Sequence, residues 1–429
     1  MIKEHRMSNI SAKKYLITNA KSTVFRVGIS TISTFIIIPF IIKGIGITNY
    51  SYVSITSFFV TFAGLFDIGL SKSLVYLLNN ANEDSNKKNQ YITAVRIINL
   101  AIISLILLIG FGAILGGMNI LGKNISQDNQ YFAVIASSSI IILALSIYNM
   151  YQSALLESYF MLEHNNYGMM VKIMSLNALY FLNLITVNDT TLYIVSPILS
   201  VLCTAIYYSL IIRRNIEYKH HRPTKDVWKS VASHSFEFCK IGILTSVNSA
   251  LPNLCLIYLG NNVAYVGVLD VITKITFSVI NLFSTISRPL YALSRKKPDT
   301  IKKKMPLILL IYGCAGLAFI TTIYLFRGYI AAYFFSGSVF TPDFIQTILM
   351  IYIIGYAIQL LSQPLSQYLM GIGKYKNVAK SLLANTIIFI TGFLILKNQL
   401  AINILVTLSI INLLISITFT TSLYTRYRK

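Results

Sequence analysis

Four polar side chains in an otherwise apolar stretch, residues 262–293, have the types and spacing to bind an anion. Asp270, Lys274, Asn281 and Arg288 fall within about 40° of one another at ~100° per residue on a helix, and they extend over about 27 Å. Asp270 and Lys274 are four residues apart, so they can pair on the helix face. Two readings follow. Either the pair is internal and Arg288 reaches the headgroups, or Lys274 and Arg288 line a hydrated wall that binds a phosphate-type anion.

A second polar stripe runs along the predicted helix 344–370. It carries Tyr352, Tyr356, Gln359 and Gln363 on one side, again from the helical repeat. Amides hydrogen-bond in both directions and aromatic rings offer flat faces, which is what a sugar requires of a binding surface. The alternative is that the amides hydrogen-bond between helices, a common use of such residues within membranes.

Three further polar residues stand in the first half of the chain. Gln152 and Glu157 form a thinner version of the same kind of stripe, with Glu157 near a helix end. Asp67 interrupts a run that otherwise suits lipid, and Lys72 is rotated about 140° away from it on a helix, so Lys72 is not its obvious partner. Asp67 therefore needs a partner on another helix, a proton or water, and it is a candidate lumen acid or ion-coupling group together with Asp270 and Glu157.

The elements that must position these residues are membrane-spanning helices. Hydrophobic residues make up 55% of the 429-residue chain and charged residues 12%, against about 25% charged residues in soluble domains. Apolar segments of a length suited to a bilayer recur throughout, which predicts an all-α, polytopic fold of about twelve helices. We expect them near 21–42, 50–78, 91–115, 131–157, 169–187, 191–212, 236–259, 262–293, 305–326, 344–370, 378–396 and 400–423.

The basic residues sort by side of the membrane. If the N-terminus is cytoplasmic, 30 of the 36 Lys and Arg residues lie at cytoplasmic ends and loops. This distribution obeys the positive-inside rule and places both termini in the cytoplasm. The net charge of +22 therefore reports topology and does not indicate nucleic acid as a partner.

The chain divides into two similar halves. The longest hydrophilic stretch, residues 213–234, is basic and separates a six-helix lobe at 1–212 from another at 235–429. "SALLESYFM" at 153–161 and "SQPLSQYLM" at 362–370 share Ser, Leu, Tyr and Met at matching positions. An even number of helices per repeat predicts pseudo-symmetric lobes around a central cavity that forms the substrate path.

Motifs of catalysis are missing from the sequence. It contains no G-x-x-x-x-G-K-[ST] loop, no H-E-x-x-H pair and no nucleophile elbow. The four cysteines are scattered along predicted helices, so we interpret them as small apolar side chains and not as metal ligands. We therefore expect no enzyme, no metal and no cofactor, although coupling to H⁺ or Na⁺ stays open.

Several segments resemble the O-antigen flippases, the polysaccharide-transporter branch of the multidrug/oligosaccharidyl-lipid/polysaccharide exporter superfamily. The likeness is carried by the Gly-x-x-x-Tyr turn at 46–50, by "DIGLSKSL" at 67–74, and by "YVGVLDVITKI" and "ISRPLYALSR". Length, helix number and the basic central linker agree over essentially the whole chain.

The resemblance implies translocation of undecaprenyl-pyrophosphate-linked O-antigen units from the cytoplasmic to the periplasmic leaflet of a bacterial inner membrane by alternating access. It implies that charged residues of the lumen touch the pyrophosphate and the sugars. Lys274 and Arg288 are our candidates for the pyrophosphate, and the amide and aromatic stripes together with Asn281 are our candidates for the glycan. An O-antigen polymerase and a chain-length regulator are expected partners. The alternatives are a drug or small-solute antiporter of the same superfamily and, less well supported by the short external loops, an O-antigen polymerase or ligase.

Overall fold

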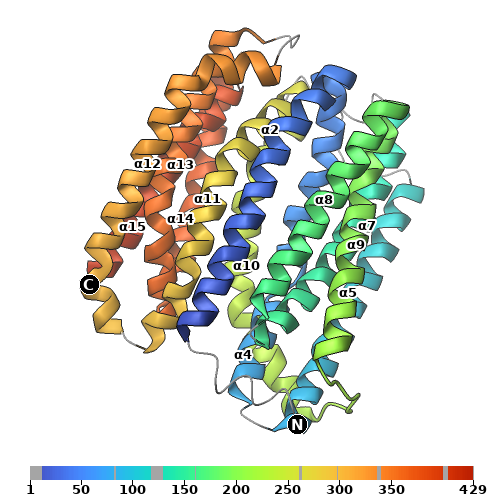
Figure 1. Ribbon diagram of the computed structural model, residues 1–429, viewed down its shortest axis with the longest axis vertical. Helices are drawn as coiled ribbons and strands as arrows, with labels where there is room; N and C mark the ends of the chain where they lie inside the picture. The colour runs from blue at the N-terminus through green and yellow to red at the C-terminus, as the bar shows by residue number, and fades with distance from the viewer. Residues whose placement is uncertain are drawn as a thin grey trace. The chain divides into compact units, whose positions relative to one another are not determined.

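The computed structural model is helical throughout its described residues and contains no strand among them, which confirms the all-α prediction. The described residues are 12–81, 84–116, 129–159, 161–259, 263–296, 298–335, 340–399 and 404–428. The helices (Figure 1) are α2 (Ala12–Phe58), η1 (Phe59–Phe62), α3 (Ala63–Phe66), α4 (Leu70–Asn80), α5 (Ser85–Leu115), α7 (Asn129–Ser158), α8 (Leu162–Thr186), α9 (Thr190–Asn215), α10 (Lys225–Leu259), α11 (Ala264–Lys296), α12 (Pro298–Phe335), α13 (Pro342–Gly371), α14 (Tyr375–Gln399) and α15 (Ile404–Arg428).

Ten helices in the described part of the chain are long and apolar enough to cross a membrane. The first of these segments, Lys21–Phe66, joins the predicted span 21–42 to the first part of the predicted span 50–78. The predicted span 262–293 corresponds to α11, which has 33 residues and is not among the ten. The chain is thus a multi-pass membrane protein.

The backbone of the first two predicted spans, 21–42 and 50–78, departs from regular helix at two places. Gly46 has φ +80° inside α2, so the helix is kinked there and continues to Phe58. Ile68 has φ 48° and Gly69 has φ 72°, which separates α3 from α4. The predicted uninterrupted helix over 50–78 is therefore broken, because left-handed backbone cannot continue a right-handed helix. Asp67 consequently lies at the C-cap of α3 and not in the middle of a helix.

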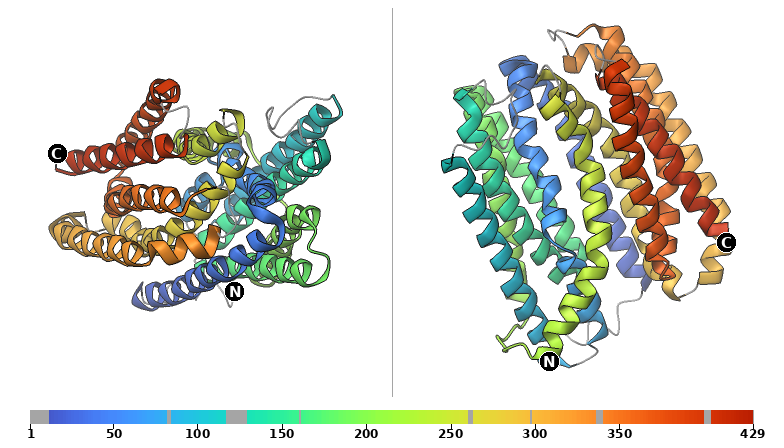
Figure 2. Two further views of the ribbon diagram at one scale, coloured as in Figure 1. Left: turned by 90° about the horizontal axis from the view of Figure 1, so that it is seen from above. Right: turned by 180° about the vertical axis from the view of Figure 1, so that it is seen from behind.

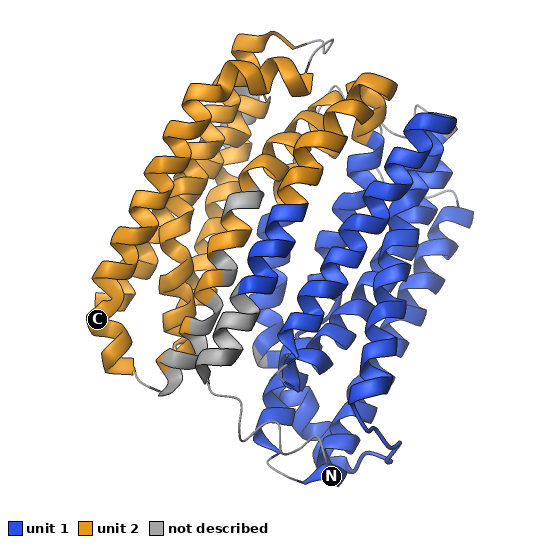
Figure 3. Cartoon of the chain, in the orientation of Figure 1, with its two compact units in different colours: residues 1–29, 52–250 blue, residues 30–51, 251–429 orange. Residues whose placement is uncertain are grey.

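The structure divides into two compact units (Figure 3). Unit 1 consists of residues 1–29 and 52–250, and unit 2 of residues 30–51 and 251–429. Both α2 and α10 contribute to both units, so the units are not simple halves of the sequence. The lobes at 1–212 and 235–429 stay a prediction from sequence. Helix α10 begins at Lys225, within the predicted linker.

In unit 1, α7 is the central helix. It packs against α4, α5 and α9, while α8 packs against α9. One part of the core joins α4, α5, α7 and α10 through fully buried side chains that include Leu74, Val95 and Val231. The helices run alongside one another for most of their length (Figure 2).

In unit 2, α13 holds the corresponding position. It packs against α11, α12 and α15, while α14 packs against α15. Met305, Leu369 and Leu423 are buried together where α12, α13 and α15 meet. The helix α7 thus packs on α4, α5 and α9 in the same way as α13 packs on α11, α12 and α15. The sequence match between 153–161 and 362–370 involves these two helices, α7 and α13.

Candidate functional site

A cluster of three polar side chains lies inside unit 2, between α2 and α11. The Lys274 Nζ is 2.7 Å from the Asp270 Oδ2. The Tyr50 hydroxyl donates a hydrogen bond to the same carboxylate oxygen at 2.6 Å, and Lys274 donates to the Tyr50 oxygen at 3.1 Å. The predicted Asp270–Lys274 pair is therefore present, and a tyrosine from a distant part of the sequence completes it.

Close packing of α2 on α11 brings these groups together. The Gly267 N–H donates to the Ser51 hydroxyl at 3.1 Å. A Cβ at Gly267 would lie 2.5 Å from that hydroxyl oxygen and 3.1 Å from the Ile47 carbonyl oxygen. Only glycine permits this approach, which places Tyr50 next to Asp270 one turn further along α11.

The cluster holds the Asp270 carboxylate in place by hydrogen bonds and leaves the Lys274 side chain partly exposed. Tyr50 is 1% exposed, whereas the side chains of Lys274 and Asp270 are 39% and 20% exposed. The carboxylate accepts two strong hydrogen bonds, so its charge is stabilised within the protein. The ammonium lies 5.5 Å from the centroid of the Tyr50 ring, which adds a cation–π contact. Such an arrangement presents a positioned cation to an anion that comes from the exposed side.

Of the two remaining residues of the α11 stripe, Asn281 and Arg288, the structure describes the side chain of Asn281 alone. Asn281 is exposed and lies about two turns beyond Lys274 on the same face. Arg288 lies further along α11, and its side chain is outside the part of the structure that is described. The stripe's proposed roles in binding pyrophosphate and glycan therefore stay predictions.

The second stripe lies on α13, which packs against α11 within unit 2. Tyr352 and Tyr356 are buried, with ring centroids 6.0 Å apart. Among the described residues, the Tyr352 hydroxyl has no hydrogen-bond partner. No described protein group hydrogen-bonds the side-chain amides of Gln359 and Gln363 either, and both residues are partly exposed. The reading that these amides serve only to join helices thus finds no support within the described residues.

The candidate residues of unit 1 have other surroundings. Asp67 is 4% exposed and accepts hydrogen bonds from Ser71, through the hydroxyl at 2.6 Å and the backbone N–H at 3.1 Å. Gln152 is buried and donates to the Ser209 hydroxyl of α9 at 2.6 Å. Glu157 is exposed near the end of α7. No described hydrogen bond or ion pair joins these three residues to one another, and their proposed roles stay predictions.

Sequence reasoning missed the contribution of Tyr50 and its neighbour Ser51. Tyr50 was part of the Gly-x-x-x-Tyr turn, but nothing in the local pattern indicates a partner 220 residues away. The described residues contain no group of three or more His, Cys, Asp or Glu side chains that could hold a metal ion.

A multi-pass helical chain with an ionic cluster inside one of its units is a structure typical of membrane transport proteins. No protein-family model matches the chain, and no curated protein matches it. Solved structures do match over nearly the whole length. An inward-facing multidrug resistance MATE family transporter of the MOP superfamily has a TM-score of 0.71 at 12% identity, with 95% of this chain and 98% of that chain covered.

Two further structures share the fold. An outward-facing multidrug resistance MATE family transporter gives a TM-score of 0.68 at 15% identity, with coverages of 98% and 97%. The lipid II flippase MurJ, in an inward closed conformation, gives a TM-score of 0.74 at 13% identity, with coverages of 96% and 88%. The chain thus has the fold found in MOP superfamily transporters and in a lipid II flippase.

Proposed function

We propose that this chain is an alternating-access transporter that moves undecaprenyl-pyrophosphate-linked oligosaccharide units from the cytoplasmic to the periplasmic leaflet of a bacterial inner membrane. The observation that carries the proposal is Lys274 of α11, whose side chain is 39% exposed while its ammonium contacts Asp270 and Tyr50. A fold shared with a lipid II flippase supports a lipid-linked substrate. The amide and aromatic stripe on α13 suits the sugar part.

The physical problem that the proposed protein solves is the charge of the pyrophosphate. An ionised group crosses hydrocarbon only at a large cost in hydration free energy. A hydrated path with fixed cations removes much of that cost, while the polyprenyl tail remains in the lipid. Two negative charges that leave a negative interior gain roughly 4–5 kcal/mol per 100 mV. Antiport of H⁺ or Na⁺ is compatible with this mechanism but is not required by it.

Complementation of a bacterial strain that lacks its own O-antigen flippase tests the proposal. Lys274→Met and Arg288→Ala are expected to abolish display of O-antigen on lipopolysaccharide at normal protein levels, and to cause lipid-linked units to accumulate in the cytoplasmic leaflet. Lys303→Met is the matched control, because Lys303 is an exposed cation near the start of α12. Normal display in both lumen variants would refute the anion-binding path.

The second candidate is a drug or small-solute antiporter, which the likeness to MATE family transporter structures supports. It predicts efflux of organic cations from loaded vesicles when a proton or sodium gradient is applied. Our proposal predicts no such efflux, and no change in drug resistance when the gene is deleted. Efflux at a rate sensitive to Lys274→Met would favour the antiporter over the flippase.

A further inference from the structure

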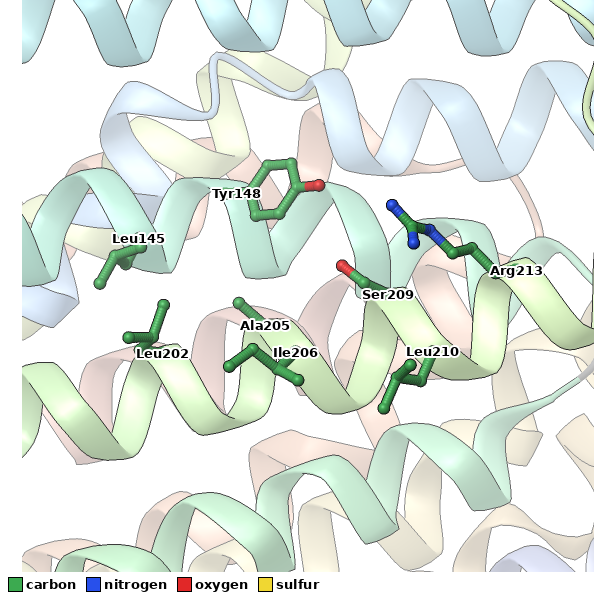
Figure 4. A pocket seen from close by; sticks show the side chains of 8 residues that line it. All are labelled: Leu145, Tyr148, Leu202, Ala205, Ile206, Ser209, Leu210 and Arg213. Carbon is green, nitrogen blue, oxygen red and sulfur yellow. The ribbon is translucent and has the colours of Figure 1, made fainter.

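An open groove lies between α7 and α9 within unit 1, and one of its lining residues, Ser209, is the hydrogen-bond partner of Gln152. The volume of the groove is about 330 Å³. Helix α7 contributes Leu145 and Tyr148, and helix α9 contributes most of the remaining wall, from Leu202 to Arg213. The two ends differ in chemistry: Leu145 and Leu202 lie at one end, and the polar groups of Tyr148, Ser209 and Arg213 at the other (Figure 4).

The polar end is built with the help of a buried amide. Gln152 is 2% exposed, and its Nε2 donates to the Ser209 Oγ at 2.6 Å. Because Ser209 accepts this bond, its own hydroxyl proton is available to an acceptor in the groove. The Tyr148 hydroxyl and the Arg213 guanidinium point into the same space (Figure 4). Three donors thus converge at one end of the groove.

The charge of this end favours an anion. Arg213 is exposed, and no described acidic side chain forms an ion pair with it. A guanidinium with two neighbouring hydroxyl groups matches the oxygens of a phosphodiester, since arginine donates in a planar fork. No acidic residue lines the groove.

The groove as a whole has about the length of one leaflet, and apolar side chains line most of it. Leu202, Ile206 and Leu210 are 40%, 53% and 50% exposed and follow one another along α9. From Leu202 to Arg213 the helix rises about 16 Å at ~1.5 Å per residue. That is roughly half of the ~30 Å hydrocarbon core. A chain that starts at Arg213 and follows the groove would therefore reach the middle of the bilayer.

We infer that this groove binds one anionic glycerophospholipid from the leaflet on the side of Arg213. The phosphodiester accepts hydrogen bonds from Arg213, Tyr148 and Ser209, and one acyl chain lies against the leucine and isoleucine side chains. An annular lipid held only by hydrophobic contact would not need the converging donors. The inference does not depend on the transported substrate, because no residue of the ionic cluster lines the groove.

The test uses the full chain purified from nanodiscs of equal parts phosphatidylglycerol and phosphatidylcholine, with bound lipids counted by native mass spectrometry. The unaltered protein is expected to retain one phosphatidylglycerol in preference to phosphatidylcholine. Arg213→Gln is expected to weaken that retention about tenfold, since one charge-assisted hydrogen-bonding group is lost. Arg214→Gln is the matched control, with the same charge change about 100° away on the same helix.

A second variant tests the inference even if Arg213→Gln fails to fold. Leu202→Trp fills the apolar end, leaves Arg213 intact and is expected to expel the same lipid. Equal retention in Arg213→Gln and Arg214→Gln would overturn the inference, as would equal retention of phosphatidylcholine and phosphatidylglycerol. In nanodiscs to which a polyprenyl phosphate is added, its preferential retention over phosphatidylglycerol would likewise overturn the inference.

Discussion

The substitution Gly69→Ala tests how the break between α3 and α4 is held against α10. Gly69 has φ 72° at the N-cap of α4. A Cβ there would lie 2.6 Å from the Ser235 carbonyl oxygen and 2.7 Å from the Cys239 backbone nitrogen. Both are backbone atoms of α10, so no side-chain rotation relieves the contact. The nearby hydroxyls of Ser73 and Ser235 lie 2.9 Å apart, which ties the same two helices together.

Two costs add in this variant. Left-handed backbone costs an L-residue roughly 1–2 kcal/mol, and insertion of a methyl group into tight packing typically costs about 1–3 kcal/mol. Gly69→Ala should therefore lower the free energy of unfolding by ~2–5 kcal/mol from these two terms. Gly112→Ala is the control in the same unit, because nothing lies within 4 Å of a Cβ at Gly112 in α5. It should stabilise the helix by about 0.5–1 kcal/mol.

The assay is the temperature at which the purified protein loses its monodisperse peak, in one detergent for all variants. We expect a drop of several degrees for Gly69→Ala and no drop for Gly112→Ala. Gly69→Asn separates the two costs, since asparagine tolerates left-handed backbone but keeps a Cβ. An unchanged midpoint in both Gly69 variants would refute the close approach to α10.

Three other perturbations follow from the described contacts. Lys274→Met alone should lower the thermal midpoint more than the double variant Lys274→Met/Asp270→Asn does, because the single change leaves a partly buried carboxylate without its cation. Equal midpoints would contradict the Asp270–Lys274 ion pair. Gly267→Val should force α2 away from α11 and lower both midpoint and export, since its side chain would overlap the Ser51 hydroxyl; a normal midpoint would show that the helices do not pack so closely. Asp67→Asn should preserve the midpoint, because an amide oxygen still accepts hydrogen bonds, and should slow export; unchanged export at every pH would show that the charge is unnecessary.

The helices and one ion pair could be predicted from sequence because both depend on neighbours along the chain. Apolar segments long enough to cross a bilayer can be recognised from their composition alone. Asp270 and Lys274 meet because a helix places residues four apart on one face, and their 2.7 Å contact confirms the expectation. The first result needed only the length and composition of each segment, and the second only the helical repeat.

The remaining features depend on tertiary packing. The second partner of Asp270 is Tyr50, which lies 220 residues earlier in the sequence and is brought close by the glycine contact between α2 and α11. The break after Asp67 includes Ile68 at φ 48°, and a β-branched residue gives no signal for left-handed backbone. Gly69, which follows at φ 72°, lies close to backbone atoms of α10, and the prediction of a helix over 50–78 did not include this contact.

The two central helices, α7 and α13, pack in equivalent ways but use their amides differently. In α7, Asn149 donates to the Val201 carbonyl oxygen of α9 at 3.0 Å, and Gln152 donates to the Ser209 hydroxyl, so both amides join neighbouring helices. In α13, no described protein group hydrogen-bonds the side chains of Gln359 and Gln363. A buried amide that bonds within the protein stabilises packing, whereas a partly exposed amide without a protein partner is available to water or a ligand. These two amides and the partly exposed Lys274 side chain lie on the adjacent helices α13 and α11 of unit 2, and our proposed function assigns substrate recognition to them.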